Sequence, residues 1–98
     1  MASEMQERIA RAIYEDRNGH GCVMWSRRGR ADRAPYLSDA LAAMKAMLEP
    51  TPAMLEAAEW AAEDGALLDF DRDDFRLTFT AGISHEIAAA EEARRDQD

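Results

Sequence analysis

Alanine is the feature that most constrains how this chain folds. Of the 98 residues, 20 are alanine, and only 26 larger apolar or aromatic side chains remain to fill a core. Alanine is the strongest helix former, but its burial removes little apolar surface from water. We therefore expect a single all-α domain over residues 1–98, in which four helices pack around a thin core. Such a domain depends on helix propensity, tight packing or a partner for its stability.

The start of the chain predicts a first helix followed by a long loop. Ser3 and Gln6 have the spacing of a capping box and Gly19 suits a helix end, so this helix is expected over 4–18. Its apolar stripe comprises Met5, Ile9, Ala12 and Ile13. Three glycines interrupt the pattern in the stretch that follows, and the same stretch contains four arginines. This composition predicts an Arg-rich loop over 19–34.

Prolines mark the next two helices. Pro35 suits a first helical turn, which places the second helix over 35–48. Thr51 is a residue type that caps helices, and Pro52 follows it at the first helical position. The third helix is therefore expected over 52–64.

The last third of the chain admits two interpretations. Four large apolar residues repeat every four positions, as on one face of a helix: Phe75, Phe79, Ile83 and Ile87. This spacing favours a long fourth helix over 72–94, capped by Asp71 or Asp73, with 95–98 as a frayed tail. Apolar and polar residues also alternate in the same stretch, which favours instead an α+β fold with a short hairpin around 67–80.

Two segments of the chain resemble a family of small proteins. Residues 7–13 contain an Arg-Ala-Ile run, and residues 43–57 contain an Ala-Met-x-x-Pro-Thr-x-x-Met segment. In these motifs the chain is similar, over about its first 58 residues, to small uncharacterised proteins of phages and proteobacterial prophages. That family closes with a Trp-x-x-Met-Ile-Asp helix, whereas residues 79–84 of this chain read Phe-Thr-Ala-Gly-Ile-Ser. The resemblance implies a phage-type origin and a helical fold, and it implies no activity or catalytic residues.

Negative charge is concentrated in one part of the chain. The net charge is −8, and the segment 49–74 alone has this value because it contains nine acidic residues and only Arg72 as a base. This balance argues against a protein that coats nucleic acid or anionic membranes. We expect the acids of this segment to form a negative surface. The candidate partner-binding residues on it are Glu56, Glu59, Glu63, Asp64, Asp69, Asp71, Asp73 and Asp74.

These acids suggest a function in binding another protein. Carboxylates replace phosphates as counter-charges on a basic surface, and Trp60 among them is either an apolar anchor or a half-buried core residue. The hypothesis is an inhibitor of a host complex that handles nucleic acid, such as a CRISPR effector; the plain alternative is the solvated face of an acidic protein. Two other functions stay open. They are a homo-oligomeric structural or morphogenesis protein, with a homodimer as its simplest form, and a nucleic-acid binder acting through Arg27, Arg28, Arg30 and Arg33.

No spacing gathers the residue types needed for catalysis or metal binding. The acidic run 69–74 opens like a calcium loop, but Asp74 and Thr80 stand where that loop needs glycine and glutamate. His20 and Cys22 supply only two of the four ligands of a structural zinc site. We expect no enzyme activity, metal or cofactor. Because the chain has one cysteine, a charged start and no run of about 18 apolar residues, a cytoplasmic location is expected.

Overall fold

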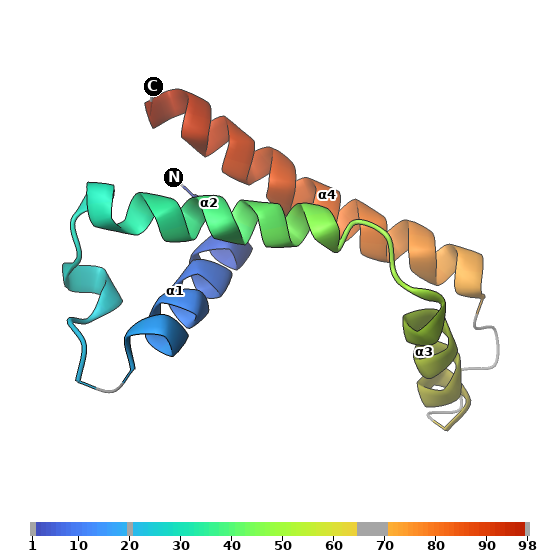
Figure 1. The fold of residues 1–98 in the computed structure, drawn as a ribbon. Helices are drawn as coiled ribbons and strands as arrows, with labels where there is room; N and C mark the ends of the chain where they lie inside the picture. Colours follow the sequence, from blue (N-terminus) through green and yellow to red (C-terminus); the bar gives the residue numbers. More distant parts are fainter. Residues whose placement is uncertain (1, 20, 65–70, 98) are drawn as a thin grey trace.

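Four α-helices make up most of the residues that this computed structural model describes, which are 2–19, 21–64 and 71–97. In chain order the elements are α1 (Glu4–Asn18), the 3-10 turn η1 (Trp25–Arg27), α2 (Arg30–Ala46), α3 (Pro52–Asp64) and α4 (Arg72–Gln97) (Figure 1). No described residue belongs to a strand, which confirms the all-α class. The alternative hairpin around 67–80 is wrong for 72–80, which are helical, and 67–70 lie outside the described residues.

Side-chain caps begin three of the helices where the sequence predicts. Ser3 and Thr51 each accept a hydrogen bond from the backbone N–H three residues later, at 3.0 and 3.1 Å. Asp71 accepts one from the N–H two residues later, at 2.7 Å. These bonds satisfy amides that the helix itself leaves without partners. The capping box at the start of α1 is incomplete, because the Gln6 side chain instead donates to the Leu37 carbonyl of α2, at 2.9 Å.

Helix α2 begins five residues earlier than predicted. Gly29, in extended conformation, precedes the helix, and Pro35 lies inside it. A proline removes one helical hydrogen bond, and the residues before it include strong helix formers, so the helix extends through this position toward its N-terminus. The predicted loop over 19–34 is therefore too long. Arg30 and Arg33 lie on α2 and not in the loop.

Helix α4 is continuous, and it contacts α2 and the segment just after α2. The Thr80 hydroxyl donates to the Leu48 carbonyl at the end of the α2 region, at 2.7 Å. Farther along, Lys45 Nζ of α2 lies 3.1 Å from Glu91 Oε1. The helix reaches Gln97, beyond the predicted end at residue 94. Two arginines in its last turn oppose the partial negative charge of a helix C-terminus, which favours this longer helix.

The core consists of two small clusters, as the scarcity of large apolar residues leads one to expect. One cluster lies between α1, η1 and α2 and contains Ala10, Tyr14, Trp25 and Ala40. The other joins α2 to α4 and contains Leu41, Met44, Ile87 and Ala90. The only large side chains among the described residues that are fully buried are those of Tyr14 and Met44.

The stripe of α1 that packs on the core lies one position beyond the predicted one. Three residues of the predicted stripe are half-buried and Ala12 is exposed, whereas the residues that are buried are Gln6, Ala10 and Tyr14. The displacement follows from packing of Tyr14 against aromatic residues distant in the sequence. Such contacts leave no periodic signal within the helix.

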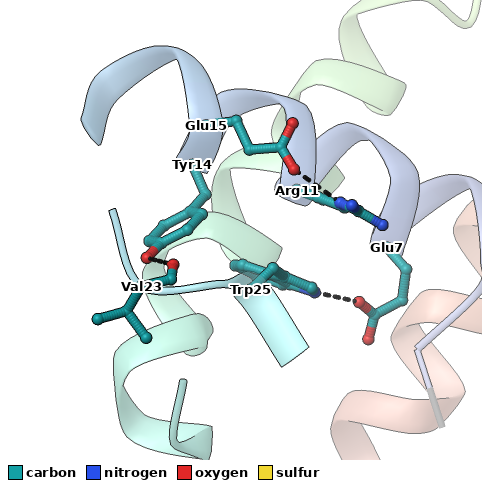
Figure 2. Close-up of polar contacts among 6 residues, drawn as sticks. All are labelled: Glu7, Arg11, Tyr14, Glu15, Val23 and Trp25. Carbon is teal, nitrogen blue, oxygen red and sulfur yellow. Dashed lines mark hydrogen bonds and ion pairs between the residues drawn. The ribbon is translucent and has the colours of Figure 1, made fainter. Parts of the chain in front are cut away.

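An aromatic cluster holds the segment between α1 and α2 in place (Figure 2). The Tyr14 ring lies 5.5 Å from the Trp25 ring and 5.3 Å from the Tyr36 ring, between ring centroids. The Tyr14 hydroxyl donates to the Val23 carbonyl, and Trp25 Nε1 donates to the Glu7 carboxylate at 3.0 Å. Each polar tip of the cluster therefore has a partner, as buried tyrosine and tryptophan require.

The molecule is elongated, with α3 at one end (Figure 1). Its radius of gyration is 16.6 Å, whereas a compact domain of this length has about 13 Å. Helix α3 packs mainly against α4, away from α1 and η1. We call α3 together with residues 71–80 the arm, and the remaining described residues the body.

Candidate functional site

One face of α3 points away from the core and combines a large apolar residue with acids. Leu55 and Ala62 are buried on the opposite side of the helix. Trp60 is 61% exposed. Glu56 precedes Trp60 by four residues and Glu63 follows it by three, so both glutamates are its neighbours on the helix surface. The sequence allowed Trp60 to be either an apolar anchor or a half-buried core residue. Its exposure shows that the second interpretation is wrong.

An ion pair joins the two helices of the arm. Arg72, the first residue of α4, donates two hydrogen bonds to the Glu59 carboxylate, at 2.9 and 3.0 Å. These hydrogen bonds lower the pKa of Glu59 and raise the pKa of Arg72. A paired geometry of this kind is the strongest that a guanidinium and a carboxylate form. It sets the acidic start of α4 beside the middle of α3.

Part of the predicted acidic face is neutralised by the protein's own arginines. Glu59 is paired with Arg72, and Asp73 Oδ1 lies 3.6 Å from Arg76. Asp69 lies outside the described residues, and Asp64 is the last residue of α3. Four exposed carboxylates of the face form no ion pair with a described residue: Glu56, Glu63, Asp71 and Asp74. Glu56 is nevertheless close enough to Arg72 to contribute to the raised pKa of that arginine.

Further apolar side chains are exposed on the arm and next to it. Leu77 on α4 and Met54 on α3 are both exposed, as is Met47 just after α2. Leu77 was missed by the sequence analysis because it lies two positions from Phe75 and therefore off the predicted stripe. That spacing is itself the signal that places Leu77 on a different face of the helix. The arm thus offers apolar contacts together with negative charge.

The four candidate arginines do not form one basic surface. The Arg28 guanidinium lies 5.4 Å from the centroid of the Tyr14 ring, and its Nε donates to the Tyr14 hydroxyl at 3.2 Å. The Arg33 guanidinium lies 5.8 Å from the centroid of the Trp25 ring. These two arginines cover the aromatic cluster by cation–π contact. The two that are exposed without such contacts are Arg27 and Arg30.

Near the aromatic cluster, one tyrosine has a shifted pKa. Burial raises the pKa of Tyr14, and the neighbouring Cys22 adds to the rise, whereas Arg28 opposes it. A raised pKa keeps the hydroxyl protonated and able to donate to the Val23 carbonyl. The arrangement accounts for a structural role of this tyrosine.

Comparisons with known proteins supply no relative. No protein-family model, no curated protein and no solved structure matches the chain. The resemblance to phage and prophage proteins therefore stays a prediction. In the part of the chain that the structure describes, no helix has the length and apolar character to cross a membrane, and no three potential ligands among His, Cys, Asp and Glu are grouped to hold a metal ion.

Proposed function

We propose that the chain is a phage- or prophage-type accessory protein that acts by binding another protein through the outward face of the arm. The observation that supports this proposal most is the exposure of Trp60 between two unpaired carboxylates, Glu56 and Glu63. Tryptophan is enriched among residues that dominate binding energy at interfaces. A helix that placed such a side chain there for stability alone would bury it.

The partner's surface, in this proposal, is basic and has an apolar pocket. Four unpaired carboxylates on the arm supply the complementary charge, and the chain as a whole has a net charge of −8. A surface that normally binds phosphates fits this description, so the arm acts as an inhibitor of a host complex that handles nucleic acid, such as a CRISPR effector. Association driven by such charges is fast and weakens as salt rises.

The test is capture of host proteins by charge variants of the arm. The variant Glu56→Gln/Glu63→Gln removes two unpaired carboxylates beside Trp60. Its matched control is Asp39→Asn/Glu92→Gln, which removes two exposed carboxylates from the body. A protein captured by the unmodified chain and identified by mass spectrometry is expected to be lost with the arm variant and kept with the control. If both variants capture it equally, binding by the charged arm is wrong.

A homo-oligomeric structural protein is the second candidate. The elongated shape and the exposed apolar residues of the arm favour it, because they leave surface that a second copy could cover. Light scattering over a range of concentrations separates the two candidates. Assembly beyond a dimer favours the structural role, whereas a monomer at all concentrations favours binding to a different protein.

A further inference from the structure

A groove lies in the body, apart from the arm. It has a volume of about 820 Å³ and is bounded by the start of α1, the first half of α2 and the last turns of α4. Its apolar walls include Leu37, Leu41, Ala90 and Ala93. Cavities that hold small molecules typically measure 300–1,000 Å³ and have mostly apolar walls with a few polar groups. The groove fits this description in size and in lining.

Three arginines line this groove without an ion-pair partner. Arg30 and Arg33 approach from α2, and Arg94 approaches from the end of α4. None of the three forms an ion pair with any described residue. Arginines that line one groove without ion pairs favour the binding of an anion there. Guanidinium groups are also the side chains best suited to hold a carboxylate or a phosphate.

The two glutamates that line the same groove are engaged elsewhere. The Glu4 carboxylate lies 3.6 Å from the Arg8 guanidinium, and the Glu7 carboxylate accepts the hydrogen bond from Trp25 Nε1. Neither carboxylate forms an ion pair with one of the three arginines, although Glu7 keeps its negative charge because the indole is neutral. With three arginines and two glutamates, the lining of the groove has a small excess of positive charge in a strongly acidic protein.

Buried polar atoms at the groove lack partners of their own. Gln6 is only 6% exposed, and its Oε1 accepts no hydrogen bond. Its Nε2 donates to the Leu37 carbonyl, which fixes the orientation of the amide group. Arg33 Nε is likewise buried without an acceptor. Both atoms are inaccessible to solvent, so the cost of leaving them without partners is borne by the fold itself.

From the size of the groove, its apolar walls and its three arginines without ion pairs, we infer that the groove binds an amphipathic organic anion. The anionic group lies near Arg30, Arg33 and Arg94 and supplies the counter-ion that these arginines lack. The apolar part of the ligand covers the walls of the groove. Carboxylate and phosphate share this chemistry. The site is independent of the proposed binding by the arm, because it uses none of the same residues.

The probe for the test is N-decanoylglycine, used below the concentration at which it forms micelles. It has a carboxylate, an amide N–H and an alkyl chain, and its ethyl ester is the matched uncharged control. Calorimetric titration is expected to show binding of the acid, with binding of the ester weaker by about tenfold or more. Decyl phosphate in parallel distinguishes a preference for phosphate from one for carboxylate, and either preference supports the site.

Adjacent arginines supply matched variants. Arg94 lines the groove, whereas its neighbour Arg95 is exposed and does not. Arg94→Gln is expected to weaken binding by about tenfold, and Arg95→Gln by less than about twofold. Circular dichroism serves as the control that both variants stay folded. In amide NMR spectra the side-chain NH₂ signals of Gln6 should move with added probe, while the Trp60 indole signal should not.

Several results would overturn the inference. One is no binding of either anionic probe at millimolar concentration, and another is equal binding of acid and ester. Equal weakening by Arg94→Gln and Arg95→Gln would mean that only bulk charge attracts the probe. Movement of the Trp60 signal in place of Gln6 would locate the probe on the arm. Tighter binding of an acidic amphipathic peptide than of either probe would assign the groove to a protein segment.

Discussion

The two tryptophans of the chain have opposite environments. Trp25, in the body, is 8% exposed, lies in a cluster with two tyrosines and donates its indole hydrogen bond to Glu7. Trp60, in the arm, is largely exposed beside unpaired carboxylates. The same side chain therefore stabilises the fold in one region and stays available for contact in the other. Large side chains that stabilise the fold and large side chains that stay exposed therefore lie in different regions of the chain, and substitutions can test that separation.

The largest expected effect is that of Trp25→Ala. Removing this side chain leaves a cavity between α1 and α2 and frees the Glu7 carboxylate from its partner. Replacing a buried tryptophan by alanine typically costs about 3–5 kcal/mol. In a core with few large residues, we expect this loss to abolish most of the folded population. Urea unfolding followed by circular dichroism measures it, and a loss below about 1 kcal/mol would contradict the role of the cluster.

Helix caps provide a second comparison between body and arm. Ser3→Ala removes a buried cap in the body and should lower the free energy of unfolding by about 1 kcal/mol. Thr51→Ala removes an exposed cap at the start of α3. Because α3 contributes less to the core, loss of this cap should mainly speed amide hydrogen exchange within α3. Equal effects of both variants on global unfolding would show that arm and body unfold as one unit.

A smaller effect on stability is expected for Trp60→Ala. The side chain fills no core space, so the free energy of unfolding should change by no more than about 0.5 kcal/mol. Quenching of fluorescence by acrylamide checks its exposure directly. Trp60→Phe should leave only the shielded emission of Trp25. If easily quenched emission persists in that variant, the two environments are not as different as described.

The smallest expected effect concerns pH and the ion pair of the arm. The hydrogen bonds from Arg72 lower the pKa of Glu59, so the pair stabilises the arm above the ordinary glutamate pKa of about 4.3. This contribution is lost as the pH falls through the lowered value. NMR titration of the Glu59 carboxyl should give a midpoint below that of the same group in Arg72→Gln. Identical midpoints would contradict the pairing.

Local signals account for how much of the fold the sequence could predict. Capping by Ser3, Thr51 and Asp71 depends on neighbours within three residues, and the helix starts that they predict are confirmed. Pro35 misled the prediction of α2, because a proline is compatible with both the first turn and a later one if the helix accepts a missing hydrogen bond. Composition already indicated that the core would be thin.

Contacts between distant residues account for what the sequence did not reveal. Burial of Tyr14 depends on Trp25 and Tyr36, which lie on other elements. Likewise, Arg94 is more than sixty residues from Arg33, and only the packing of α4 brings both to one groove. The composition of the segment 49–74 indicated an acidic face, but it did not indicate that Arg72 neutralises part of that face. Pairing geometry of that kind follows from how two helices meet.

The decisive measurement is capture of a host protein by Trp60→Ala, beside capture by the unmodified chain. Because the body remains intact in this variant, lost binding cannot be attributed to unfolding once circular dichroism shows equal stability. If the arm is the binding surface, a protein held by the unmodified chain is no longer held by Trp60→Ala. Undiminished capture would contradict the claim that the arm is the binding surface.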